Sequence, residues 1–268
     1  MNVLILGGDG FVGRHLQKEL ARDPAISVTA PESGKLDIRD REALSRAASG
    51  MDVIYNLVGI IKGSDKQFYD LHVGGTKNVV YAARAERVKK IVYISALGVA
   101  DPRAQMIPYF ATKAEAERVI IASGISHTIL RPSAMFGPGA GFLKPFVRII
   151  RWSPILLLPG MGKYRFQLVA VDTTARILAR AAAGGEGTYV VSGPEVLTLR
   201  EIFSRLLRYL GKKRVTIPVP FAIPVPGIIT RSQLAMLRLE NFGESGKTKE
   251  TFDYPDIYFD PKGAYPLL

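Results

Sequence analysis

Cysteine is absent from the 268 residues of the chain, which excludes disulfides, thiolate metal sites and a thiol nucleophile. Long apolar runs are also absent, and stretches such as residues 155–158 fall far short of the ~20 residues that span a bilayer. The first residues lack the basic region that opens a signal peptide. We therefore expect a cytoplasmic protein, either free or peripheral to a membrane, without a metal site.

Acidic residues are in the minority: 24 Asp and Glu stand against 36 Lys and Arg, and the formal net charge is +12. A charge of this size attracts anionic ligands, nucleic acid or acidic lipid headgroups. No nucleic-acid-binding motif and no Lys/Arg tract with interleaved aromatic residues accompanies it, so we expect no nucleic-acid partner. The simplest interpretation of the charge is a solvated surface rich in arginine.

Short apolar segments alternate with amphipathic ones over the first half of the chain, which is the pattern of βαβ units. The segments that predict strands are 2–6, 26–30, 52–58, 90–95, 126–131 and 188–192. The segments that predict helices between them are 11–22, 40–48, 68–85 and 109–123. The expected fold is therefore α/β, a Rossmann-type doubly wound parallel sheet.

Beyond Arg131 the alternation loosens into amphipathic helices and Pro-rich extended pieces. The helices are expected at 142–152 and 199–210, and the Pro-rich pieces at 217–220 and 224–226. We expect a small C-terminal cap on the carboxyl edge of the sheet, with elements mainly from 137–180 and 197–268. The whole chain, residues 1–268, then forms one domain.

Three glycines with the spacing G-x-x-G-x-x-G stand directly after the first expected strand and directly before the first expected helix. Gly7 permits a tight turn, Gly10 lets the backbone approach a pyrophosphate, and Gly13 lets the helix pack close to the sheet. Phe11 and Val12 open the helix, whose N-terminus then faces the phosphates. The turn predicts a site for a dinucleotide cofactor.

A Y-x-x-x-K pair, Tyr109 and Lys113, opens the helix expected after the fifth strand of the Rossmann pattern, which is the segment 90–95. One helical turn separates the two side chains, so they share a face, and a nearby ammonium favours the phenolate form of a tyrosine. Such pairs also arise by chance on solvated faces. The position of this pair favours use of Tyr109 as an acid/base group.

With these two motifs in this order, the chain resembles the extended or atypical short-chain dehydrogenases/reductases over nearly its whole length. It most resembles the branch that contains the NADPH-binding accessory subunit of respiratory complex I. The strings that carry this resemblance are DVIYNLVG at 52–59, VYISALG at 92–98, RP at 131–132, FGPG at 136–139 and FQLVAVD at 166–172.

The resemblance implies a role for residues along the adenosine half of the cofactor. Asp37 and Ile38, after a very short third strand, should meet the adenine, with the carboxylate accepting from its amino group. Leu57, Val58 and Gly59 should pass beneath the adenosine ribose and the pyrophosphate. Simple core packing is the alternative for Leu57 and Val58.

The resemblance also implies the residues of the nicotinamide half. Ser95 should lie near the nicotinamide ribose, Lys113 should bond the ribose hydroxyls, and Pro132 should approach the carboxamide. Tyr109, Lys113 and Ser95 are then the catalytic residues. Core packing is again the alternative for Pro132.

Three departures from the family pattern concern catalysis. The hydroxyl residue that usually stands two positions after Ser95, to bind the substrate oxygen, is Leu97 here. A position that is usually asparagine is His72, which we interpret as a structural or cofactor-side replacement. The short span from Ser95 to Tyr109 leaves little room for a loop that reads a large sugar nucleotide.

Residues after the second strand bear on the choice of cofactor. An acidic residue there bonds a ribose hydroxyl and favours NAD, as Glu32 would. Ser33 and Lys35 would instead accept a 2′-phosphate. The complex I branch and the basic surroundings favour NADP, with NAD as the alternative.

Three functions are compatible with these features. The first is an NAD(P)-dependent oxidoreductase that transfers hydride at a carbonyl or alcohol of a small molecule, and the second is a sugar-nucleotide epimerase or dehydratase. The third is a non-catalytic NADP(H)-holding subunit that docks on a membrane respiratory complex. Lys144, Arg148 and Arg151 give the expected helix 142–152 a basic face that would contact a membrane or such a complex, or else only solvent. No motif in the cap identifies the substrate, and none sets the oligomeric state.

Overall fold

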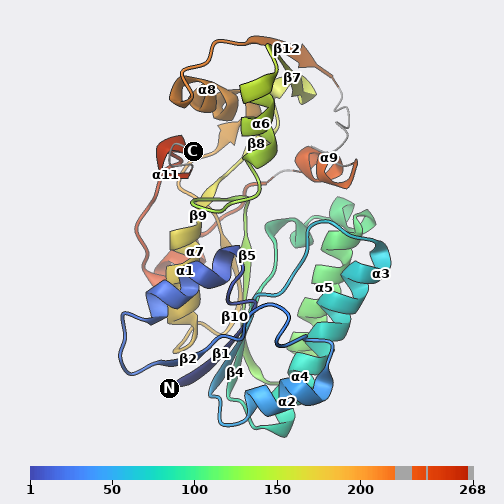
Figure 1. Cartoon of the computed structure of the whole chain (residues 1–268), viewed down its shortest axis with the longest axis vertical. Helices are drawn as coiled ribbons and strands as arrows, with labels where there is room; N and C mark the ends of the chain where they lie inside the picture. The colour runs from blue at the N-terminus through green and yellow to red at the C-terminus, as the bar shows by residue number, and fades with distance from the viewer. Residues whose placement is uncertain (221–230, 240, 265–268) are drawn as a thin grey trace.

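A parallel six-stranded sheet forms the centre of the molecule, in the order β10-β5-β4-β3-β1-β2 (Figure 1). The computed structural model describes residues 1–220, 231–239 and 241–264, so the Pro-rich piece at 224–226 lies outside the described residues. The strands are β1 (Asn2–Leu6), β2 (Ser27–Thr29), β3 (Val53–Asn56), β4 (Lys90–Ile94), β5 (Ser126–Pro132) and β10 (Gly187–Val191). Every neighbouring pair is parallel, which confirms the predicted doubly wound sheet.

Helices cover both faces of this sheet, which is why its central strands are almost wholly apolar. The helices are α1 (Phe11–Leu20) and α7 (Val171–Ala181) on one face and α2 (Arg41–Ala48), α4 (Gly75–Ala85) and α5 (Pro108–Ala122) on the other (Figure 1). Alternate residues of β1 serve the two faces: Val3 and Ile5 pack toward α1 and α7, while Leu4 and Leu6 pack toward α2 and α4. The period of two in a strand thus divides the core into two layers.

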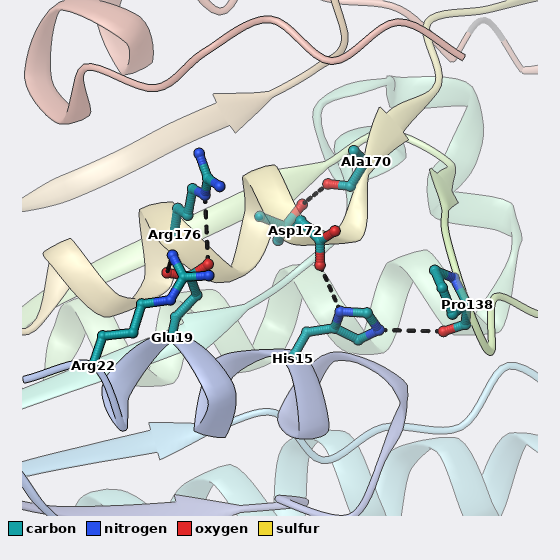
Figure 2. Close-up of polar contacts among 8 residues, drawn as sticks. His15, Glu19, Arg22, Pro138, Ala170, Asp172 and Arg176 are labelled. Carbon is teal, nitrogen blue, oxygen red and sulfur yellow. Dashed lines mark hydrogen bonds and ion pairs between the residues drawn. The ribbon is translucent and has the colours of Figure 1, made fainter. Parts of the chain in front are cut away.

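Polar contacts fix α1 to α7 (Figure 2). His15 Nδ1 lies 2.7 Å from Asp172 Oδ1, and its Nε2 lies 3.2 Å from the carbonyl oxygen of Pro138. One turn further along, Glu19 accepts from Arg176 Nε at 3.4 Å. Because Pro138 follows β6 (Met135–Phe136), at the start of the cap, His15 ties the helix that carries the glycine turn to both the sheet layer and the cap.

The cap has a hydrophobic core of its own, separate from the two layers around the sheet. Its elements are α6 (Lys144–Trp152), β7 (Ile155–Pro159), β8 (Arg165–Phe166), β11 (Leu197–Thr198), α8 (Leu199–Tyr209), β12 (Val215–Val219), α9 (Arg231–Arg238) and α11 (Pro261–Ala264). β7 pairs with β12, β8 with β11, and β6 with β9 (Val169–Ala170). No described helix has the length and apolar composition needed to cross a bilayer.

Two helices inside the segments expected to form the cap pack on the sheet instead. α7 lies against α1, as described above, and α10 (Gly246–Phe252) follows α9 back to the edge strand β10. Phe252 is buried there, with its ring centroid 5.0 Å from that of Tyr189 in β10. The chain therefore leaves the sheet, builds the cap and returns twice.

Two local expectations differ from the structure. The very short third strand expected before Asp37 is not formed: residues 30–40 make turns, in which Lys35 N donates to Glu32 O and Asp40 N donates to Asp37 O. The expected helix 68–85 is divided into α3 (Asp65–Phe68), a π-helical turn (Tyr69–Gly74) and α4. A π-helical turn widens the helix by one residue and often occurs at functional sites.

We predict that Gly13→Ala destabilises the fold by about 2 kcal/mol or more, because the added Cβ would lie 2.2 Å from Gly7 O and 2.5 Å from Gly8 O. Both contacts are with backbone and cannot be relieved by a rotamer change. Urea unfolding followed by circular dichroism measures the loss. Gly246→Ala is the matched control, since its added Cβ would meet no atom of the described residues within 4 Å beyond its neighbours and its own helix. Equal stability of the two variants would contradict the close packing at Gly13.

Candidate functional site

The glycine turn lies at the point where the chain order of the sheet reverses, between β1 and β3. Gly7 has φ +81°, and an added Cβ would lie 3.3 Å from Leu57 C. Gly10 N donates to Gly7 O at 3.1 Å, and beyond its chain neighbours and its own helix a Cβ on Gly10 would meet only that oxygen of the described residues within 4 Å. The backbone of the turn is therefore open above Gly10, and α1 starts there without an acidic residue in its first turn. This is the arrangement that accepts a phosphate.

The segment after β2 holds the residues expected at the adenine. Ile38 is buried against Gly75, the first residue of α4. A Cβ on Gly75 would lie 2.2 Å from Ile38 Cδ1, so this position of the helix requires glycine. Asn78 Nδ2 donates to Ile38 O at 3.0 Å. The carboxylate of Asp37 accepts from Arg39 Nε, and this contact lowers the pKa of Asp37. The contact of Asp37 with adenine stays a prediction.

Residues 57–59 follow β3 along the carboxyl edge of the sheet, and their contact with the cofactor stays a prediction. Val58 packs partly buried against the α2 and α4 layer, and Val58 N donates to Asn56 Oδ1 at 3.3 Å. At Gly59 an added Cβ would lie 3.2 Å from Lys113 Nζ. The glycine therefore lets the β3 loop approach the lysine of the Y-x-x-x-K pair.

His72 stands on the π-helical turn, at the position that is usually asparagine in the family, and connects this loop to α5. Its Nε2 accepts from Ile60 N at 3.3 Å, and its Nδ1 lies 2.9 Å from Thr112 Oγ1. Because the Thr112 hydroxyl donates to Pro108 O at 2.8 Å, it accepts from His72, and the neutral Nδ1–H tautomer satisfies all three bonds. Burial and the Lys113 charge lower the pKa of His72 to about 3. The geometry supports a structural role and leaves no free nitrogen for a general base.

Tyr109 and Lys113 start α5, with Pro108 at its first position. Lys113 Nζ donates to Ile94 O at 2.9 Å and lies 4.7 Å from the centroid of the Tyr93 ring. Burial lowers the pKa of Lys113 to about 7, against the opposing effect of Glu117. Burial also raises the pKa of Tyr109 to about 12, the opposite of the direction expected from a Tyr–Lys pair. In the free protein the tyrosine is therefore a neutral phenol.

Glu117 and Arg131 form a buried ion pair behind the lysine, which the sequence analysis did not predict. Glu117 is almost fully buried, and Arg131 Nε donates to its Oε1 at 3.0 Å. Glu117 lies one turn beyond Lys113 on the same face of α5, so the spacing K-x-x-x-E was the available signal. The partner, Arg131 on β5, could not be identified without the order of the strands.

Ser95 follows β4 and places an unsatisfied hydroxyl at the site. Its Oγ is buried and has no hydrogen-bond partner among the described residues. Leu97 starts a 3₁₀ turn (Leu97–Ala100) and is also buried. Because its side chain is apolar, this position supplies no hydroxyl to the site. A buried polar atom without a partner is costly, which makes Ser95 Oγ a candidate donor to a ligand.

A cavity of about 290 Å³ lies between the carboxyl edge of the sheet and the cap. Phe11 and Pro132, both expected at the cofactor, line its wall. The rest of the wall is largely apolar and includes Leu97, Phe110, Phe142, Phe146, Phe166, Met236 and Leu239. The polar side chains that line it are Ser95, Tyr109, Ser133 and Asn241. No charged side chain belongs to the described lining, so the cavity suits an apolar molecule with few polar groups.

Two of the polar lining residues are already engaged. Asn241 Oδ1 accepts from Ala134 N at 2.6 Å, and the Ser133 hydroxyl donates to Gln167 O. Of the predicted catalytic residues, the structure thus brings Ser95 and Tyr109 to the cavity wall, while Lys113 lies behind it. Ser95 and Tyr109 are the hydroxyls that remain for a ligand.

Ser33 and Lys35, from which the preference for NADP was inferred, are both paired with carboxylates. The Ser33 hydroxyl donates to Asp9 Oδ1 at 2.8 Å, and this contact lowers the pKa of Asp9. Lys35 Nζ lies 3.0 Å from Glu32 Oε2, with both side chains exposed. Asp9 and Glu32 would favour a ribose hydroxyl, whereas Ser33 and Lys35 would favour a 2′-phosphate.

We predict that the stability of the free protein rises with pH between 7 and 10, by up to about 3 kcal/mol relative to Lys113→Met. The pKa of Lys113 is about 7 in the fold against an ordinary value of 10.5, so between these values the unfolded chain binds the extra proton. Urea unfolding at a series of pH values measures the slope. Lys77→Met, at an exposed position on α4, should keep the slope of the parent. An unchanged slope in Lys113→Met would contradict a buried lysine with a lowered pKa.

Residues 3–192 match the model of the NAD dependent epimerase/dehydratase family. The chain is similar to the 2-alkyl-3-oxoalkanoate reductase of Stenotrophomonas maltophilia, with 27% identity over 82% of this chain and 79% of the relative. It is also similar to the mitochondrial NADH dehydrogenase (ubiquinone) 1 alpha subcomplex subunit 9 of Arabidopsis thaliana. That similarity is 26% identity over 98% of this chain and 75% of the relative.

Among solved structures, the chain is similar to UDP-glucuronic acid 4-epimerase from Bacillus cereus in complex with NAD, with a TM-score of 0.80 and 18% identity. The superposition covers 98% of this chain and 96% of the epimerase. At this identity the likeness concerns the fold alone.

Proposed function

The chain belongs to the NAD dependent epimerase/dehydratase family, as its resemblance to extended short-chain dehydrogenases/reductases predicts, and we propose that it interconverts a ketone and an alcohol in a largely apolar molecule. The family is NAD(P)-dependent, and its relatives include reductases, epimerases and complex I subunits. The observation that carries the proposal is the cavity, whose apolar wall holds the hydroxyls of Ser95 and Tyr109 and no charged group among the described residues. The name of the bacterial relative, a reductase of a 2-alkyl-3-oxo acid, fits the same chemistry.

The site residues fit a dinucleotide. The backbone above Gly10 is open, and any larger residue there would project into that space. The pyrophosphate would lie over Gly7, Gly10 and Gly13, and the nicotinamide half near Ser95 and Pro132. When bound, the nicotinamide supplies or accepts the hydride.

The protein's own residues move the proton and hold the oxygen. Tyr109 is a neutral phenol at neutral pH, and its raised pKa keeps it so at higher pH, so it is in the form that donates a proton to a carbonyl oxygen. Ser95 Oγ donates a second hydrogen bond to the same oxygen, in place of the hydroxyl that Leu97 lacks. Hydride addition to carbon and protonation of oxygen together give the alcohol. Lys113 binds the ribose hydroxyls and adds positive charge behind Tyr109.

The sugar-nucleotide alternative is disfavoured by the same cavity. A nucleotide sugar brings a diphosphate, which proteins usually bind with arginine, lysine or a helix N-terminus. The described lining of the cavity contains neither arginine nor lysine. The likeness to a UDP-glucuronic acid 4-epimerase concerns the fold and does not bear on this choice.

A cofactor-holding subunit of a respiratory complex is the second candidate. It is favoured by the Arabidopsis relative, whose name places it in NADH dehydrogenase, and by the replacement of a catalytic hydroxyl by Leu97. Lys144, Arg148 and Arg151 are exposed on one face of α6, as the basic helix 142–152 predicts, and would face such a partner.

We predict that Tyr109→Phe lowers the rate of ketone reduction by about 100-fold or more, while the cofactor Kd changes less than about twofold. The lost hydroxyl faces the cavity, whereas the cofactor is held mainly by backbone. Stopped-flow oxidation of the reduced cofactor with alkyl 3-oxo acids of increasing chain length measures the rate, and calorimetry measures the Kd. Tyr81→Phe, on the exposed face of α4, is the matched control. A bound cofactor with no turnover on any ketone or alcohol, in the parent protein, would favour the subunit alternative.

The preference for NADP over NAD stays a prediction, and a charge reversal tests it. Lys35→Glu should weaken NADP about tenfold more than NAD, because a charge-assisted contact to the 2′-phosphate is lost. Asp9→Asn should change the ratio in the other direction, because it removes a carboxylate that repels that phosphate. Calorimetric Kd values for both cofactors measure the ratio, with Lys77→Glu as control. Equal effects of Lys35→Glu and Lys77→Glu would remove the basis for NADP.

A further inference from the structure

The two-stranded ribbon of β7 and β12 exposes an apolar face at the outer end of the cap. The strands are parallel, with Ile155 opposite Val215 and Leu157 opposite Ile217. Leu156 and Leu158 point into the cap core and are fully buried, so their neighbours point outward. Ile155 and Leu157 are each 45% exposed, Val215 62% and Ile217 41%. These four residues form the outer face of the ribbon.

Trp152 is a further exposed apolar side chain close to this ribbon in the chain. It is the last residue of α6, stands shortly before β7 and is 84% exposed. Met161, in the turn after β7, adopts φ +58° and is also exposed. Large apolar side chains gathered on one surface of a protein usually mark an interaction site, and tryptophan is enriched where proteins meet the headgroup level of a bilayer.

The charge around the outer face is mainly positive, although Arg205 is paired with Glu195 and α8 has the exposed Glu201 in its first turn. Residues 144–164 and 202–220, which include α6, β7, most of α8 and β12, contain nine Lys and Arg and no Asp or Glu. Between α8 and the ribbon lies a cleft of about 560 Å³. Its cationic lining residues are Arg200, Arg208, Lys212, Lys213 and Arg214. The described lining of this cleft has no carboxylate.

We propose that the outer end of the cap docks on the surface of an anionic lipid bilayer. The outer face and Trp152 would insert at the level of the headgroups, and the surrounding cations would contact lipid phosphates. A second copy of the chain is disfavoured because two such surfaces repel each other. Nucleic acid is disfavoured because aliphatic side chains occupy the centre of the surface. Figure 1 places β7 and β12 at the far end of the cap, away from the sheet, where a flat surface can reach them.

The docking surface connects to the cavity through α6. Phe146 of this helix lines the cavity, and Trp152 at its end belongs to the docking surface. A bilayer would therefore lie one short helix away from a cavity that suits an apolar molecule. This connection depends on the proposed oxidoreductase function, whereas docking itself does not.

The single tryptophan of the chain reports docking directly. The full chain is titrated with vesicles of phosphatidylcholine alone and with vesicles that also contain phosphatidylglycerol. We expect a blue shift of Trp152 emission and co-sedimentation only with the anionic vesicles, both reversed by added salt because the attraction is screened. An unshifted emission with anionic vesicles overturns the proposal. A dimer in the absence of vesicles, abolished by Leu157→Glu, would also overturn it in favour of a second copy.

Matched variants separate the surface from general effects of charge. Leu157→Glu should lower the vesicle partition coefficient about tenfold or more, since a carboxylate replaces an inserted apolar group and is repelled by the headgroups. Ile121→Glu, at an equally exposed position on α5 (50%), should leave it nearly unchanged. Lys212→Glu with Lys213→Glu should remove the preference for anionic vesicles, and Lys18→Glu with Lys77→Glu should keep most of it. Cofactor affinity, measured by calorimetry, should be unaffected in all of them and shows that each variant is folded. Equal losses in the paired variants would overturn the proposal.

Discussion

The buried ammonium of Lys113 is the constraint on which the arrangement of the site depends. A lone charge in a protein interior is costly, and its pKa shifts until the group is partly neutral. Here one carbonyl, Ile94 O, and the face of Tyr93 are its immediate partners, and the charge of Glu117 is shared with Arg131. The free protein therefore holds the lysine in an incompletely stabilised state. Ribose hydroxyls and an anionic cofactor would supply the hydrogen bonds and the negative charge that the ammonium lacks. Binding would then raise the pKa of Lys113, so it should be coupled to proton uptake.

Neighbouring departures from regular structure follow from the same constraint. The β3 loop can approach the lysine only because residue 59 is glycine. The loop is held at that distance by His72, which stands on the π-helical turn and reaches Thr112, the residue beside Lys113. Burial is the main cause that lowers the pKa of His72 to about 3, and the nearby charge of Lys113 lowers it further. The histidine that replaces the usual asparagine thus performs a structural function.

The parts of the fold that were predicted from sequence are those set by local patterns. The apolar runs of the buried strands, the glycine turn and the Tyr109–Lys113 spacing each involve few residues, and the parallel sheet follows from the alternation of strands and helices. The absent strand before Asp37 and the π-helical turn depend on contacts such as Ile38 with Gly75, which no local pattern contains. The cavity likewise joins segments from Phe11 to Asn241, and its apolar character appears only when they are brought together.

The distribution of charge is the clearest case in which structure changes the meaning of a sequence property. A net charge of +12 taken over the whole chain suggests a generally basic, solvated surface. Nine cations without a carboxylate belong to the two segments around the β7–β12 ribbon, so the rest of the chain would carry only three of the twelve net charges. The cofactor-binding part is thus close to neutral, and the field of the molecule is concentrated at the outer end of the cap. A molecule with its charge at one end approaches an anionic surface with that end first, which would bring the exposed ribbon and Trp152 to the surface before any other apolar group.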